Sequence, residues 1–139
     1  MSVEVEVFGL AHGPGAPGAQ EIAALCRTAA ARVGVSDGHL AIELVDAARI
    51  AQLNQEHRGK AGPTDVLSFP IDELEAQDGV ERELGDVVIC PEHTVDLREA
   101  IVHGVLHLLG MDHETDQGQM LATQVEILSA HARSSAART

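Results

Sequence analysis

The stretch from His103 to His113 reads His-Gly-Val-Leu-His-Leu-Leu-Gly-Met-Asp-His, and the rest of the chain is organised around it. His103 and His107 are four residues apart, so on a helix they lie one turn apart on the same face. Gly110 can adopt the left-handed conformation that ends a helix, and the chain can then turn and bring His113 toward the other imidazoles. Three imidazoles with a fourth position open are typical of a catalytic zinc site. The stretch therefore predicts one zinc ion per chain, bound by a helix and the turn after it.

The residue after the first histidine is Gly104. The spacing His-x-x-x-His-x-x-Gly-x-x-His is that of the metzincin metalloproteases. Zinc peptidases of this kind carry a glutamate, their general base, directly after the first ligand, and a glycine has no side chain to accept a proton. A metallopeptidase therefore stays open as an alternative, but one that lacks its usual base.

The composition is that of a single soluble domain with its own hydrophobic core: 139 residues, of which 45% are hydrophobic and 22% charged. The net charge of −13 repels polyanions, so nucleic-acid binding would need a local basic patch or a partner that supplies affinity. Phe8 and Phe69 are the only aromatic residues of the sequence, so we expect no stacking platform for bases.

Neither a membrane span nor a signal peptide is expected. No segment approaches the roughly 18 consecutive apolar residues of a membrane helix, and the first residues lack a basic end and an apolar core. These features argue against export. Cys26 and Cys90 are accordingly predicted to be two buried thiols rather than a disulfide.

Hydrophobic periodicity divides the chain into alternating strands and helices. Strands are expected at about 2–8, 39–45, 65–70 and 84–91, and helices at about 19–33, 46–57, 94–109 and 116–133. Pro70 indicates that its strand ends there or lies at a sheet edge. The order predicts an α+β fold with a small mixed four-stranded sheet packed with about four to five helices. Residues 1–133 are expected to form a single domain, and 134–139 a disordered tail.

Positive charge gathers in the turn Arg58–Thr64, directly before a predicted strand. Arg58 offers a planar, permanently charged group that can bind phosphate bidentately, and Lys60 adds a point charge. Ser68, in the strand that follows, is a weaker candidate for contact with substrate.

Three blocks together resemble the YbeY-type endoribonuclease family of bacterial rRNA maturation factors, over about residues 40–130. They are the stretch from His103 to His113, Arg58-Gly-Lys-Ala-Gly-Pro-Thr-Asp-Val-Leu-Ser-Phe-Pro and Leu84-Gly-Asp-Val-Val-Ile-Cys. The resemblance implies an α+β, metal-dependent hydrolase of the cytoplasm that cuts single-stranded RNA. It implies a role at the 3′ end of the small-subunit rRNA and in ribosome quality control, with ribosomal RNA and the small ribosomal subunit as partners. Because the chain is acidic, a ribosomal protein that contributes positive surface is a further expected partner.

By the same resemblance His103, His107 and His113 are the zinc ligands, and Arg58 is needed for RNA cleavage. Zinc held by three imidazoles lowers the pKa of bound water toward about 7, or polarises a phosphate that a 2′-hydroxyl attacks. Arg58 would stabilise the charge that develops on the phosphate. Asp112 is expected to support an imidazole N–H, or to serve only as a turn residue, rather than to act as a base. A non-catalytic, zinc-stabilised ribosome-assembly module is the remaining alternative.

Overall fold

The computed structural model describes residues 3–9, 15–71, 83–111 and 118–137, with side chains described as far as 133. Its elements are β1 Val3–Phe8, α1 Ala19–Arg32, β2 Gly38–Leu44, α2 Ala47–Arg58, β3 Val66–Pro70, β4 Glu83–Ile89, the 3-10 helix η1 Pro91–His93, α3 Leu97–Leu108 and α4 Gln119–Ala137. The predicted strands and helices are all present in the predicted order. The short helix η1 was not predicted.

The sheet has the strand order β1-β2-β4-β3. β1 pairs with β2 and β2 with β4 in parallel, whereas β3 pairs with β4 antiparallel, so the sheet is mixed as predicted. β3 lies at one edge, and Pro70 is its last residue. Because an edge strand has one side without a ladder, a residue that lacks an N–H is tolerated there.

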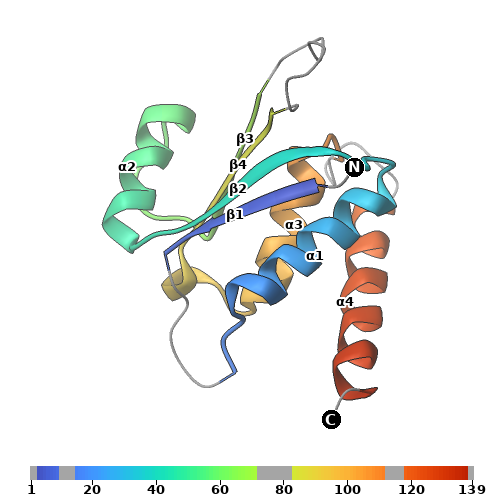
Figure 1. Cartoon of the computed structure of the whole chain (residues 1–139). Coiled ribbons are helices and arrows are strands. Elements are labelled where there is room, and N and C mark those ends of the chain that lie inside the picture. Colours follow the sequence, from blue (N-terminus) through green and yellow to red (C-terminus); the bar gives the residue numbers. More distant parts are fainter. Residues whose placement is uncertain (1–2, 10–14, 72–82, 112–117, 138–139) are drawn as a thin grey trace.

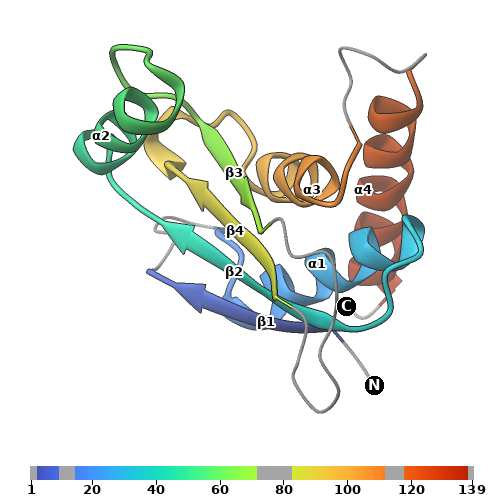
Figure 2. The same ribbon diagram turned by 90° about the horizontal axis from the view of Figure 1, so that it is seen from above.

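Helices cover both faces of the sheet: α1 and α3 lie on one face with α4 outside them, and α2 lies on the other (Figures 1 and 2). β4 shows how the two layers are built. Its Val87 and Ile89 belong to the main core beneath α1 and α3, whereas Val88 and the adjoining Cys90 pack with Ile50 of α2. An interior strand that is buried on both faces reads as a continuous apolar run, which explains this sequence.

Aspartate caps fix the starts of the two helices that carry the candidate site residues. Asp46 accepts a hydrogen bond from the backbone N–H of Arg49 at 2.8 Å, as its place before α2 predicted. Asp96 caps α3 by accepting from the N–H groups of Arg98 and Glu99, so α3 begins at Leu97, three residues later than predicted.

The last helix differs from the prediction at its C-terminal end. α4 continues to Ala137, four residues past the predicted end, and so enters the range 134–139 for which the sequence predicted disorder. The single domain 1–133 and the disordered tail stay predictions. No helix in the described ranges is long and apolar enough to cross a membrane.

Both cysteines are buried free thiols, as predicted. Cys26 belongs to the core cluster under α1 and α3, and Cys90 to the cluster under α2, so they lie on opposite faces of the sheet. Burial raises the pKa of the Cys26 thiol to about 12. A thiol with that pKa is unreactive in the folded protein at neutral pH.

Candidate active site between β3, α2 and α3

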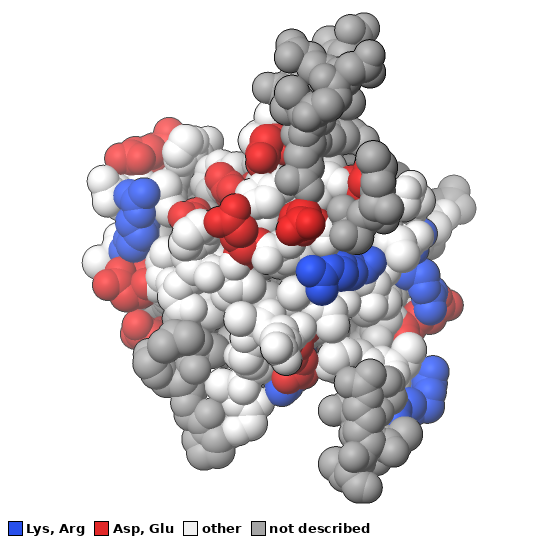
Figure 3. All heavy atoms as spheres, in the orientation of Figure 1, with Lys and Arg blue, Asp and Glu red and all other residues white. Residues whose placement is uncertain are grey.

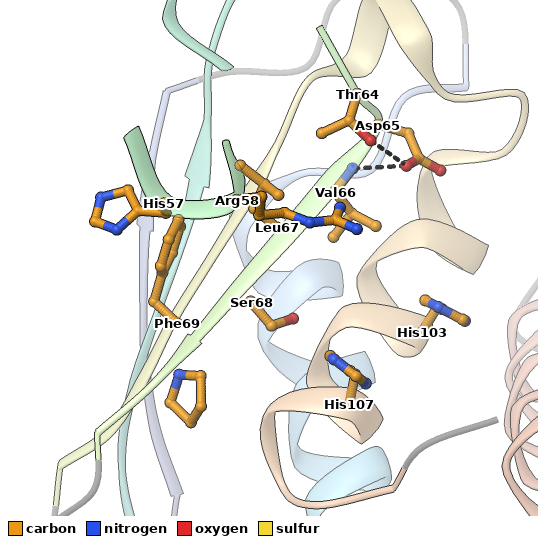
Figure 4. A pocket seen from close by; sticks show the side chains of 11 residues that line it. His57, Arg58, Thr64, Asp65, Val66, Leu67, Ser68, Phe69, His103 and His107 are labelled. Carbon is orange, nitrogen blue, oxygen red and sulfur yellow. Dashed lines mark hydrogen bonds between the residues drawn. The ribbon is translucent and has the colours of Figure 1, made fainter. Parts of the chain in front are cut away.

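A cavity of about 560 Å³ lies at the edge of the sheet where β3 passes between the end of α2 and α3. Four of the predicted site residues line it together: Arg58, Ser68, His103 and His107. Figure 4 shows the two imidazoles on one side of β3 and His57 and Phe69 on the other. The fold thus brings together residues that are up to 49 positions apart (107 − 58) in the chain.

The two imidazoles are one helical turn apart on α3, and each is oriented by an oxygen atom. His103 Nδ1 lies 3.0 Å from Oε1 of Gln124, and His107 Nδ1 lies 3.1 Å from the carbonyl oxygen of Met111. A carbonyl oxygen can only accept, so in each ring Nδ1 is the donor, and it is the Nε2 atom of a neutral ring of this tautomer that can bind a metal. Histidines that bind metals are oriented in this way, so both residues fit a zinc ion.

The turn that follows begins where the sequence predicted it. Gly110 has a φ of +108°, which L side chains rarely adopt, and its N–H donates to the carbonyl oxygen of His107 at 3.1 Å. The N–H of Met111 donates to the carbonyl oxygen of Leu106. The predicted third ligand His113 and its predicted support Asp112 lie outside the described residues. Within the part of the chain that is described, no three metal-binding side chains gather.

Arg58 is the last residue of α2, and its side chain extends across β3 toward the imidazoles (Figure 4). It is exposed and lines the cavity, and no hydrogen bond or ion pair engages its guanidinium among the residues placed by the structure. By contrast, Arg32 and Arg98 are engaged by glutamates. Lys60 is exposed on the turn after α2 and does not line this cavity, so its proposed contact with substrate stays a prediction.

Ser68 forms a hydrogen bond between the two sides of the cavity. Its hydroxyl donates to the carbonyl oxygen of Gly104 on α3 at 2.8 Å, which links β3 to the helix that carries the imidazoles. The hydroxyl oxygen can still accept a hydrogen bond from a ligand. Contact of Ser68 with substrate also stays a prediction.

Gly104 faces the sheet rather than the cavity. A Cβ atom there would lie 2.6 Å from Cγ1 of Val87 and 3.0 Å from Cγ2 of Val66, closer than side chains pack. The glycine therefore allows α3 to approach β3 and β4 closely. It also means that a glutamate base of the zinc-peptidase kind has no room at this position, which weighs against the peptidase alternative.

Sequence reasoning missed Gln124 and the ring pair formed by His57 and Phe69. Gln124 is 6% exposed and lies between the buried Met120 and Ile127 on the inward face of α4. A glutamine within an apolar helical stripe was the available signal, because buried polar groups need partners. The contact between the two rings could not be predicted from a local pattern, because His57 lies on α2 and Phe69 on β3.

The face of the molecule drawn in Figure 3 offers little attraction to a polyanionic ligand. On the face drawn in Figure 3, isolated basic side chains lie among more numerous acidic ones, without a continuous basic surface. This agrees with the net charge of −13. Attraction of a phosphate to the cavity therefore depends on the local cation Arg58.

Comparison with known proteins gives a consistent result. The family model described as endoribonuclease YbeY matches residues 18–132. Proteins named endoribonuclease YbeY from Nocardioides sp. (strain JS614) and Rubrobacter xylanophilus are 39% and 36% identical to this chain. The first match covers 80% of this chain and 87% of the relative, and the second covers 94% and 97%.

A solved structure shares the fold. The solution structure of a Thermotoga maritima protein superposes with a TM-score of 0.55 at 24% identity, covering 96% of this chain and 93% of the other. The match of the family model over residues 18–132 and the two relatives establish that the chain belongs to the endoribonuclease YbeY family.

Proposed function

We propose that this chain is a zinc-dependent endoribonuclease for single-stranded RNA, with His103, His107 and His113 as metal ligands and Arg58 as the catalytic cation. The observation that carries the proposal is that the Arg58 guanidinium, which no described residue engages, and two oriented imidazoles line one cavity, although they come from different elements. The relatives, which are named as endoribonucleases, support the reaction class.

The biological substrate that we propose is ribosomal RNA, in particular the 3′ end of the small-subunit RNA, with a further role in ribosome quality control in the cytoplasm. The sequence resemblance supports this choice. Because the chain carries a net charge of −13, we propose that the small ribosomal subunit and one of its proteins supply part of the affinity.

Cleavage breaks a P–O bond of the RNA backbone when water, or the neighbouring ribose 2′-hydroxyl, attacks phosphorus and the departing ribose oxygen takes up a proton. In both routes the non-bridging phosphate oxygens gain negative charge. A planar guanidinium binds two such oxygens at once, so Arg58 both positions the phosphate and stabilises this charge. Zinc, when bound, supplies Lewis-acid activation of water or of the phosphate.

The decisive experiment compares the wild-type protein with Arg58→Ala, using Arg49→Ala on the same helix as the matched control. Single-stranded RNA, the same RNA annealed to its complement, and casein are incubated in parallel, with zinc or with chelator. We expect zinc-dependent cleavage of the single strand alone, lowered by about 10²–10³-fold in Arg58→Ala and unchanged in Arg49→Ala. Zinc content should be the same in all three proteins.

Other outcomes would contradict the proposal in distinct ways. Cleavage by Arg58→Ala at the wild-type rate would remove this residue from the chemistry. Degradation of casein would favour the peptidase alternative. Binding of zinc and of ribosomal particles without any cleavage would favour the non-catalytic assembly module.

A further inference from the structure

One of the two aromatic residues of the chain lies in the wall of the candidate active site. Phe69 lines the cavity beside His57, with ring centroids 4.8 Å apart and ring planes at 68°. Phe69 is half-buried against the α2 side of the sheet, and His57 is exposed near the end of α2. Phe8, the other aromatic, is 50% exposed on β1, at the opposite edge of the sheet.

The cavity surrounds the free edge of β3. Side chains alternate along a strand, so Val66 and Ser68 face α3 whereas Leu67 and Phe69 face α2. The packing agrees, because Val66 belongs to the core under α3 and Leu67 to the core under α2. All of these residues line the cavity, and Figure 4 shows the two groups on opposite sides of the strand.

The backbone of β3 also offers polar groups along this edge. Cys90 N–H donates to the Asp65 carbonyl, and Ile71 N–H donates to that of Leu84, so the odd-numbered residues of β3 face β4. Ser68 therefore directs its N–H and C=O away from β4, toward the open side of the sheet. A phosphate that crosses the strand edge would meet this N–H next to the guanidinium of Arg58.

We infer that Phe69 and His57 form a base-stacking subsite for a nucleotide next to the cleaved bond. The inference rests on the proposed ribonuclease function. The base stacks on the ring pair on the α2 side of β3, while its backbone crosses the strand edge beneath Arg58 toward the imidazoles. Aromatic and histidine rings are the platforms on which proteins bind unstacked RNA bases.

This arrangement gives a physical reason for selection of single strands. A base that passes to the far side of β3 must leave its stack and, in a duplex, its pairing partner as well. The free-energy cost of this step is therefore smaller for a single strand than for a duplex. Stacking also does not depend on net charge, so it supplies affinity that the acidic surface cannot. The expectation of no stacking platform, drawn from the low aromatic content, is revised by this inference.

The test uses a single-stranded RNA that is cut at one bond and a series of the same RNA with one abasic ribose at each position in turn. In the wild type and in the matched control Phe8→Leu, we expect one position adjacent to the cut to lower kcat/KM about 10-fold. For Phe69→Leu, kcat/KM on the intact RNA should already be about 10-fold lower than for the wild type. An abasic ribose at the sensitive position should then lower kcat/KM no further. Phe69→Tyr, which keeps the ring, should restore the wild-type pattern.

Binding of the same RNAs, measured by fluorescence anisotropy in the presence of chelator, separates this inference from the nuclease assignment. A position-specific loss of affinity in wild-type protein that cuts nothing would reject the nuclease but support the subsite. Equal affinity for every abasic RNA would overturn the subsite even if cleavage is normal. It would also be overturned if Phe69→Leu kept the full abasic penalty, because the ring would then have only a structural role.

Discussion

Gln124 orients His103 from a different helix, and this contact belongs to the scale of single residues. The side chain is buried, and its Oε1 accepts from Nδ1 of His103 at 3.0 Å. Partners of this kind set the tautomer and direction of a metal-binding imidazole, and losing one typically costs 10–100-fold in metal affinity. Gln124 is therefore a positioning residue for the proposed zinc site.

We predict that Gln124→Leu, which keeps the volume but removes the acceptor, weakens zinc binding by about 10–100-fold. Gln124→Glu, which keeps an acceptor oxygen, should stay within a few-fold of the wild type. Zinc affinity is measured by competition with a chromogenic chelator, and Gln20→Leu, at an exposed position of α1, is the control. Wild-type zinc affinity in Gln124→Leu would show that the contact does not support a metal ligand.

At the scale of elements, the site depends on how closely α3 approaches the sheet. Gly104 lets the helix backbone lie against Val87 and Val66, and the Ser68 hydroxyl bonds to the Gly104 carbonyl. This close approach sets the distance between the imidazoles on α3 and the edge of β3. Gly104, which stands where zinc peptidases carry their glutamate base, is thus also needed for the close packing of α3 against the sheet.

Gly104→Ala should lower the free energy of unfolding by up to about 2 kcal/mol, measured by urea denaturation. Overpacking a core contact costs about 1–3 kcal/mol, and the roughly 1 kcal/mol that alanine gains over glycine in a helix offsets only part of this where the contact is as close as 2.6 Å. Ser129→Ala, at an exposed site of α4, should change stability by less than about 0.5 kcal/mol. Equal or greater stability of Gly104→Ala would mean that α3 is not held against the sheet as described.

Glu21 ties the helical layer together. Its carboxylate accepts from Arg98 of α3 at 2.6 and 3.0 Å, and Nε2 of His131 on α4 lies 2.9 Å away. The hydrogen bonds from Arg98 lower the pKa of Glu21 from 4.5 to about 2, with His131 adding to the effect. A lowered pKa in the folded state means that stability is gained above pH 4.5 and lost as the pH falls toward 2.

Glu21→Gln should therefore reduce stability at pH 6 and flatten its decline between pH 4.5 and 2. Thermal unfolding followed by circular dichroism across this range tests the expectation. Glu56→Gln, on the exposed surface of α2, is the control and should keep the wild-type decline. A parallel decline in Glu21→Gln and the wild type would show that this carboxylate is not stabilised in the folded protein.

At the scale of the whole molecule, His39 joins three strands on the sheet surface. Its Nδ1 lies 2.9 Å from Glu83 of β4 and its Nε2 lies 2.5 Å from Glu6 of β1. Only the protonated ring can donate to both carboxylates. The hydrogen bond to Glu83, with that to Glu6, raises the pKa of His39 above its ordinary value of 6.5.

The stabilisation from His39 is present below pH 6.5 and disappears as the pH rises through the raised pKa. We predict that the wild type loses stability, on the order of 1 kcal/mol or less, as the pH rises from 6 to 9. His39→Gln should show a flatter profile in urea denaturation over the same range. An unchanged slope in the variant would show that the ring is not charged between these carboxylates.

Much of this molecule could be predicted from local patterns. The strands and helices follow from hydrophobic periods of 2.0 and 3.6 residues, which depend only on the chain itself. Helix geometry places His103 and His107 on one face of the helix. The conformational freedom of glycine explains why that helix ends before Gly110. The mixed sheet was also predicted, from the order of elements.

Only the tertiary structure decided what faces the two imidazoles. β4 is buried between the two helical layers, and β3 lies beside it at the edge of the sheet. This arrangement brings Arg58 and Phe69 to the cavity that α3 also lines. It also decides that Gln124 orients His103, and that Gly104 is a packing contact with Val87. Such contacts join residues far apart in the chain, and their strength depends on close packing, which no local period of the sequence encodes.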